Sequence, residues 1–179
     1  MGLDIAAYEG LTKNDSLKFV DGDVFNQQHE IVDIPDNALI AFINPAFPDR
    51  ARDIEDRCIY NAVDRFSFKA GSYSGYNRWR EMLAKLAGYP ETRLQINGTE
   101  QSQHAFGAWI ATAGPFWELI NFSDNEGIIG TSASKKLSAD FATFDDAARA
   151  VGEAEFYQLF QLWQRAFDMA ARDGAVNFV

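Results

Sequence analysis

The spacing of apolar residues changes near residue 72, and this change restricts the fold more than any other feature of the chain. Before it, apolar and polar residues alternate in short runs, which is the pattern of strands that bury one face. After it, apolar residues recur every three or four positions, which is typical of amphipathic helices. Strands followed by helices predict an α+β fold, with C-terminal helices packed on one face of a mainly antiparallel N-terminal sheet.

The length of 179 residues predicts a single domain over 1–179, strand-rich over 1–70 and helix-rich over 71–179. The hydrophobic share of 47% excludes wholesale disorder. One cysteine excludes a disulfide framework, and two histidines argue against a histidine-rich metal centre, so we expect no metal and no cofactor. The longest apolar run, 38–43, is far shorter than the ~20 residues of a membrane span, and no signal-peptide pattern is visible. We expect a cytoplasmic protein.

Local patterns predict individual elements. The turn signal Asp21-Gly22-Asp23 lies between two apolar runs and predicts a hairpin. The apolar run 38–43 predicts a buried central strand. Each expected helix has its own start or stop signal. The first helix is expected from Ser74 as N-cap to Gly88, and the second over about 102–113 with Phe106, Trp109 and Ile110 facing inward. A third helix is expected after Thr131-Ser132, and a capping box at 143–146 predicts a further helix start. The last helix is expected over 153–172, with a buried stripe of Phe156, Phe160, Trp163, Phe167 and Ala170.

The net charge of −10 is unevenly distributed along the chain. Residues 1–45 hold eight acids and two lysines, whereas residues 46–90 hold six acids and eight bases. The acidic N-terminal third is consistent with a solvated surface, or with a patch that steers association with a basic protein partner. In the second interpretation the binding residues include Asp21, Asp23, Asp33 and Asp36. The negative charge disfavours direct nucleic-acid binding.

The start of the first expected helix gathers polar residues that could hold an anion. Guanidinium groups beside tyrosines can bind a carboxylate or phosphate in a fixed geometry. The alternative is a solvated helix face whose arginine stems cover apolar surface. The residues concerned are Tyr73, Tyr76, Asn77, Arg78 and Arg80.

The segment 114–130 contains the second set of candidates. Its carboxylates could hold a hard cation or supply a general acid and base. The alternative is a polar turn in which the carboxylates bond backbone amides. The candidates are Glu118, Asn121, Asp124 and Glu126.

Two further features lie at expected helix starts. His104 could transfer protons, although no triad-like spacing supports such a role, and the alternative is a packing residue. The segment 127–136 places small and hydroxyl residues before a helix, and such a terminus can bind an anion. The alternative is an ordinary helix start.

The segments 70–80 and 114–127 resemble those of a family of small phage and bacterial proteins with no assigned activity, as do residues 1–5 and 174–176. The resemblance implies that the first two segments meet in space to form one site. It also implies a phage–host role, including inhibition of a defence system.

Three hypotheses about function follow. The leading one is a non-enzymatic acidic binding protein, phage-associated, that engages a basic host partner such as a nucleic-acid-binding defence complex. The second is a small enzyme acting on a phosphate-containing or nucleotide-like substrate, with a site formed by 72–80 and 118–126 in which Glu118, Asp124 and His104 are catalytic. The third is a bacterial immunity or stress protein. A binding protein should show a flat acidic or aromatic patch, whereas an enzyme should show a deep pocket where these groups converge.

Overall fold

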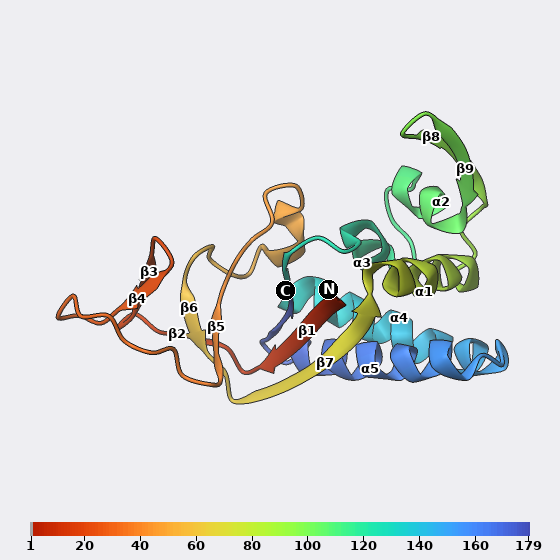
Figure 1. Ribbon diagram of the computed structural model, residues 1–179. Coiled ribbons are helices and arrows are strands. Elements are labelled where there is room, and N and C mark those ends of the chain that lie inside the picture. Colours follow the sequence, from red (N-terminus) through yellow and green to blue (C-terminus); the bar gives the residue numbers. More distant parts are fainter. Residues whose placement is uncertain (1) are drawn as a thin grey trace.

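The computed structural model describes residues 2–179 and has an α+β architecture, which confirms the predicted class (Figure 1). Its central sheet is antiparallel, with the strand order β10-β11-β1-β7. The first and last strands of the described chain are therefore neighbours. The strands are β1 (Gly2–Glu9), β7 (Asp64–Ser72), β10 (Gly127–Gly130) and β11 (Ala175–Phe178).

Residues 11–62 form an N-terminal lobe that projects from the central sheet (Figure 1). It holds a small sheet of order β2-β6-β5 and the hairpin β3-β4. The predicted hairpin is confirmed, with Asp21 and Gly22 in its turn. The elements of the lobe are β2 (Thr12–Lys13), β3 (Lys18–Val20), β4 (Asp23–Phe25), β5 (Ala38–Ile40), η1 (Pro48–Ala51) and β6 (Ile59–Asn61).

The apolar run 38–43 is not a central strand, so that prediction is wrong. Only its first half forms β5, which lies at the edge of the small sheet. The chain then leaves this sheet, and the carbonyl of Phe42 accepts a hydrogen bond of 3.1 Å from the amide of Ile128 in β10. The second half of the run is apolar because it crosses from the lobe to the central sheet.

The helices occupy the rest of the chain together with a second hairpin. Figure 1 shows α4 and α5 side by side next to the central sheet, and α2 next to the hairpin β8-β9. The helices are α1 (Tyr73–Leu86), α2 (His104–Ile110), α3 (Trp117–Phe122), α4 (Thr131–Ala150) and α5 (Ala154–Ala170). The hairpin strands are β8 (Thr92–Ile96) and β9 (Thr99–Gln103).

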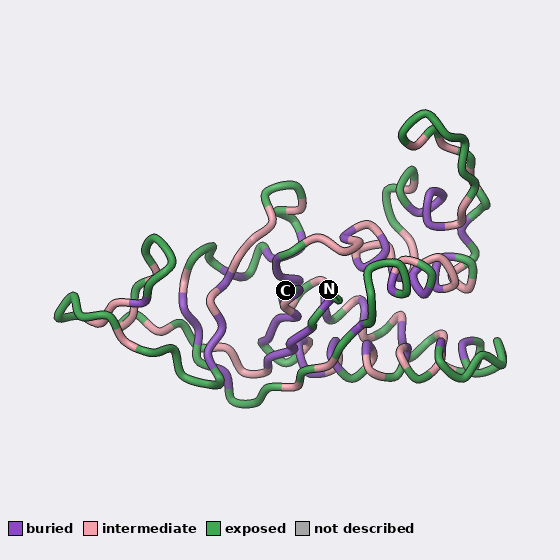
Figure 2. The backbone as a smooth tube through the Cα atoms, viewed as in Figure 1, coloured by how far each residue is buried: buried purple, intermediate pink, exposed green. Residues whose placement is uncertain are grey.

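Both faces of the central sheet are covered, as the alternation in β1 shows. Leu3, Ile5 and Ala7 belong to the main core beneath the helices. Ala6 and Tyr8 point to the opposite face and pack with residues of the lobe. Because successive side chains of a strand point to opposite faces, one strand anchors both layers. Figure 2 shows the buried residues along β1 and the inner faces of the helices, and the exposed ones at the tip of the lobe.

The stripe predicted for the last helix is confirmed, because all five of its residues are buried in the main core. Its centre is Trp163, which is fully buried. The aromatic rings around it come from β7, α1, α5 and β11, with centroids 5.1–6.0 Å from that of Trp163. This cluster joins the sheet to the helices. Its members are Phe68, Tyr76, Trp79, Phe167 and Phe178.

Two predicted helix signals are wrong. The N-cap of α1 is Ser72 rather than Ser74, since the Ser72 hydroxyl accepts a hydrogen bond of 3.1 Å from the amide of Gly75. The capping box at 143–146 starts no helix, because it lies within the continuous helix α4. A hydroxyl residue followed three positions later by an acid also occurs on the solvated face of a helix interior. Here α4 packs against α5 and continues through residues 143–146 as one helix.

The inward face predicted for the second helix is only partly correct. Phe106 is buried, whereas Trp109 is 41% exposed and Ile110 is 64% exposed. The helix has seven residues, so it is too short to bury a wide stripe, and its C-terminal end reaches the surface. The four strands after residue 90 were also unexpected in the helix-rich half.

Candidate functional site

The segments 72–80 and 118–126 lie side by side, and Arg80 joins them. Its Nη1 donates a hydrogen bond of 2.6 Å to the carbonyl of Ile120 in α3. Its Nη2 donates to Oδ1 of Asn77, one turn earlier in α1, at 2.7 Å. Arg80 is 5% exposed, so the guanidinium is held inside the protein.

Tyr76 and Asp124 complete the surroundings of Arg80. Burial raises the pKa of Tyr76, which is 0% exposed, and the same cause lowers the pKa of Arg80. The Asp124 carboxylate acts on both groups and opposes the loss of the Arg80 charge, but its own hydrogen bond of 2.9 Å comes from the Ser123 hydroxyl. Tyr76 Oη and Arg80 Nε are buried without a hydrogen-bond partner in the described chain. Four of the predicted residues thus meet, but Tyr76 and Arg80 at the centre of the cluster are buried, and only Asn77 and Asp124 are partly exposed.

Glu118 lies in a different network. Its Oε2 accepts a hydrogen bond of 2.6 Å from Nζ of Lys136 in α4. The same ammonium donates to Oδ2 of Asp140 at 2.9 Å and to the carbonyl of Gly114 at 2.6 Å. Glu118 therefore ties α3 to α4 as one member of an ion-pair network, which is a structural role.

His104 is separated from both groups. Its Nδ1 lies 2.7 Å from the carbonyl oxygen of Tyr89, and since a carbonyl only accepts, Nδ1 carries the hydrogen. The Glu81 carboxylate accepts hydrogen bonds of 2.8 Å from the amides of His104 and Ala105. Glu81 thus satisfies the first amides of α2 from the neighbouring helix, a role that the sequence analysis missed because it depends on how α1 and α2 pack.

The other candidates do not share a site. Tyr73 and Arg78 are exposed on α1. Asn121 donates a hydrogen bond of 3.1 Å to the carbonyl of Ala108, so it ties α3 to α2. Glu126 is exposed, and its backbone carbonyl accepts a hydrogen bond of 2.8 Å from the Asn44 side chain. Within residues 2–179, no three His, Cys, Asp or Glu side chains gather in a way that could hold a metal ion.

The N-terminus of α4, considered above as an anion site, is already occupied by a carboxylate of the protein. Oδ2 of Asp53 accepts a hydrogen bond of 3.2 Å from the amide of Ser132. A Cβ atom at Gly130 would lie 2.5 Å from Oδ1 of Asp53, so the glycine makes room for this contact. Asp53 supplies the negative charge that such a terminus favours.

The acidic residues of the N-terminal lobe, in contrast, form an accessible surface. Residues 14–37 contain six acids and one lysine. Asp21 lies in the turn of the β3-β4 hairpin, Asp23 begins β4, and Asp33 and Asp36 lie on the loop that follows the hairpin. All four are exposed, and no ion pair within residues 2–179 engages them. We call residues 14–37 the acidic segment.

Exposed aliphatic side chains accompany these carboxylates. Val20, Ile31 and Ile34 are 49%, 66% and 43% exposed. Ile31 forms a bridge with Phe25, and the amide of Val32 donates a hydrogen bond of 2.9 Å to Val24, so this part of the loop lies against β4. The acidic segment therefore exposes both apolar and negative side chains, and part of its backbone is hydrogen-bonded to β4.

No protein-family model, curated protein or solved structure matches the chain. None of the described helices is long and apolar enough to cross a lipid bilayer.

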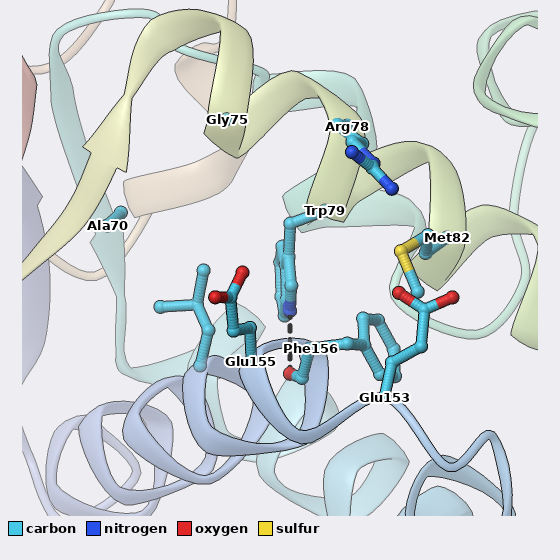
Figure 3. A pocket seen from close by; sticks show the side chains of 9 residues that line it. Ala70, Gly75, Arg78, Trp79, Met82, Glu153, Glu155 and Phe156 are labelled. Atoms are coloured by element: carbon cyan, nitrogen blue, oxygen red, sulfur yellow. Dashed lines mark hydrogen bonds between the residues drawn. The ribbon is translucent and has the colours of Figure 1, made fainter.

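The sequence analysis also missed a cleft between α1 and α5 (Figure 3). It identified Arg78 on one wall but not Glu153 and Glu155 on the other. The only signal for these acids is their position at the start of a helix, where carboxylates are common for reasons of stability alone.

Proposed function

We propose that the protein is a binding protein that engages a basic protein partner through the acidic segment of its N-terminal lobe. The observation that carries the proposal is the set of four exposed, unpaired aspartates beside three exposed aliphatic residues. Aspartates that served only folding would be expected to pair with cations or cap helices, as Asp53 does.

The two kinds of side chain have complementary effects on association. Exposed carboxylates attract a basic surface over a Debye length of about 10 Å at 0.1 M salt, which raises the encounter rate. Aliphatic side chains such as Ile31 bury apolar area once the partners meet, at roughly 25 cal/mol per Å². Interfaces combine apolar and polar side chains, and the acidic segment exposes both kinds.

The resemblance to phage and bacterial proteins defines the partner class further in this proposal. Nucleic-acid-binding proteins carry clustered Lys and Arg, which is the surface that the acidic segment complements. The partner we propose is a nucleic-acid-binding defence complex of the host. The protein would then act in the host cytoplasm as an inhibitor that competes with phosphates for the same basic surface.

The enzyme hypothesis has less support from the geometry. Glu118 is bound to Lys136, His104 faces the Tyr89 carbonyl, and Asp124 borders a buried cluster. These three groups have separate partners instead of facing a common cleft. The hypothesis keeps one clear test, which is that Glu118→Gln should abolish turnover of a nucleotide substrate.

The proposal is tested by charge reversal of the acidic segment. The immobilised protein captures partners from a bacterial lysate, and the association rate of each purified partner is then measured at low salt and at about 0.3 M salt. The variant carries lysine in place of Asp21, Asp23, Asp33 and Asp36. We expect association at low salt to slow by about tenfold or more, within the range of electrostatic steering.

A matched variant separates the patch from the net charge. It reverses four exposed acids outside the acidic segment, Glu91, Glu100, Glu126 and Asp146, so both variants move the net charge of −10 equally. We expect this control to associate at close to the unmodified rate. Equal slowing by the two variants, or association that ignores both salt and the four reversals, would refute the proposed surface.

A further inference from the structure

The cleft between α1 and the start of α5 (Figure 3) has walls on two helices that lie away from the N-terminal lobe (Figure 1). Its volume is about 320 Å³. Its inner surface is more apolar than polar. Trp79 and Phe156 form the base, with ring centroids 6.0 Å apart, and Met82 and Leu159 are partly exposed beside them. The Trp79 indole donates a hydrogen bond of 3.1 Å to the Phe156 carbonyl, which fixes the base of the cleft.

The rim of the cleft carries charges of both signs. Arg78 belongs to α1, whereas Glu153 and Glu155 belong to the start of α5. Figure 3 shows the two carboxylates rising from α5 toward α1, on either side of the Trp79 side chain in this view. Within residues 2–179, no ion pair of 4.0 Å or less engages any of these three side chains. The opposite charges are therefore exposed and unpaired across the opening in the described chain.

We infer that the cleft binds a small apolar zwitterion, either an apolar α-amino acid or a short apolar peptide. The ligand ammonium group bonds Glu155 or Glu153, and its carboxylate bonds the Arg78 guanidinium. The apolar side chain rests on Met82 and Leu159. A ligand of this class bridges the unpaired charges and covers the partly exposed Met82 and Leu159 side chains, which a purely cationic or purely anionic ligand does not.

The walls of the cleft agree with a small occupant. Its volume lies near the lower end of the range for small-molecule sites, about 300–1,000 Å³. Gly75 lines the side that α1 contributes, and a Cβ atom there would meet only the Ser72 hydroxyl within 4 Å, at 3.2 Å. The glycine is not required by its backbone conformation, since its φ lies outside the left-handed region.

The inference is tested by titrating the full chain with L-leucine, L-phenylalanine and the dipeptide Leu-Leu. Binding is followed by isothermal calorimetry and by the NMR signal of the Trp79 indole N–H. We expect at least one of these ligands to bind and to shift that signal. The free amino acids and the dipeptide distinguish the two sources of the zwitterion. N-acetyl-L-phenylalanine lacks the ammonium group, and L-phenylalaninamide lacks the carboxylate. We expect both analogues to bind about tenfold or more weakly than L-phenylalanine.

Variants that remove the charges on one side of the cleft assign each charge of the ligand to its partner. Arg78→Gln should weaken the zwitterion by about tenfold while leaving L-phenylalaninamide unaffected, and the double variant Glu153→Gln/Glu155→Gln should show the opposite preference. Lys85→Gln lies on α1 outside the cleft and should change neither. Far-UV circular dichroism verifies that each variant is folded. The inference is overturned if no ligand binds the folded protein at millimolar concentration. It is also overturned if the blocked analogues bind as tightly as the zwitterion.

Discussion

The aromatic cluster around Trp163 allows a quantitative test of the core. Trp163→Ala removes a side chain that is 0% exposed and has aromatic neighbours from two strands and two helices. Because these neighbours belong to different elements, they cannot all move inward to fill the space. We therefore expect a loss of about 3–5 kcal/mol in the free energy of unfolding, the range for large buried aromatic residues.

A second substitution at the same position separates packing from polarity. The Trp163 Nε1–H has no hydrogen-bond partner in the described chain, and an unpaired buried donor costs about 1–3 kcal/mol. Trp163→Phe removes this donor and keeps one aromatic ring in place. Removal of the unpaired donor stabilises the variant, and the cavity that phenylalanine leaves is smaller than the one that alanine leaves. We therefore expect Trp163→Phe to lower the free energy of unfolding by less than about half as much as Trp163→Ala does.

Both variants are measured by urea unfolding with far-UV circular dichroism, since the substitutions remove part of the tryptophan fluorescence. With a slope of about 1–3 kcal/mol per molar urea, Trp163→Ala should lower the midpoint by about 1 M or more. Trp109→Ala is the control, because Trp109 is 41% exposed and should cost less than about 1 kcal/mol. A loss below about 1 kcal/mol for Trp163→Ala would refute the assignment to the core. Equal losses for the two Trp163 variants would refute the cost assigned to the N–H group.

Two other predictions concern a helix terminus and the alkaline limit of stability. Asp53→Ala removes the carboxylate bonded to the Ser132 amide and should cost about 0.5–2 kcal/mol in urea unfolding, whereas Asp53→Asn should retain part of that bond; no loss in either variant would contradict the capping role. Burial raises the pKa of Tyr89 from 10.0 to about 12, so the unfolded chain loses this proton first, and stability should fall as pH rises through that interval. Tyr89→Phe should make this fall shallower without abolishing it, because Tyr76 is buried as well. The free energy of unfolding is measured by urea melts at several pH values across the interval. If its dependence on pH is the same in Tyr89→Phe and in the unmodified protein, the assignment to Tyr89 is contradicted.

Elements set by local pattern were predictable from the sequence. The stripe of α5 repeats at helical spacing, and the β3-β4 hairpin has its turn signal between apolar runs. Both depend on residues close together in the chain. The class of fold followed from the same local patterns.

Elements set by distant partners were not predictable in this way. All four residues of β10 are buried, so this strand lacks the alternation that identifies a half-exposed strand. β10 pairs with β11, and β11 in turn pairs with β1, which is far from both in the sequence. Both strands therefore depend on a distant partner. The candidate site follows the same division. Sequence identified Arg80 as a cation near a helix start, but only the position of Ile120 in α3 makes it a buried one.

The pairing of β1 with β11 has a consequence for synthesis of the protein. Asp4 and Val179 exchange backbone hydrogen bonds of 3.1 and 3.0 Å, so the middle of the central sheet is formed by residues that are far apart in the sequence. Contacts between distant residues form slowly, and this one cannot form until residues 175–178 have left the ribosome. Until then β1 can pair only with β7, and its other edge stays open beside apolar side chains. An open edge of this kind is a site of aggregation, so shortened chains that lack β11 should depend on chaperones to remain in solution.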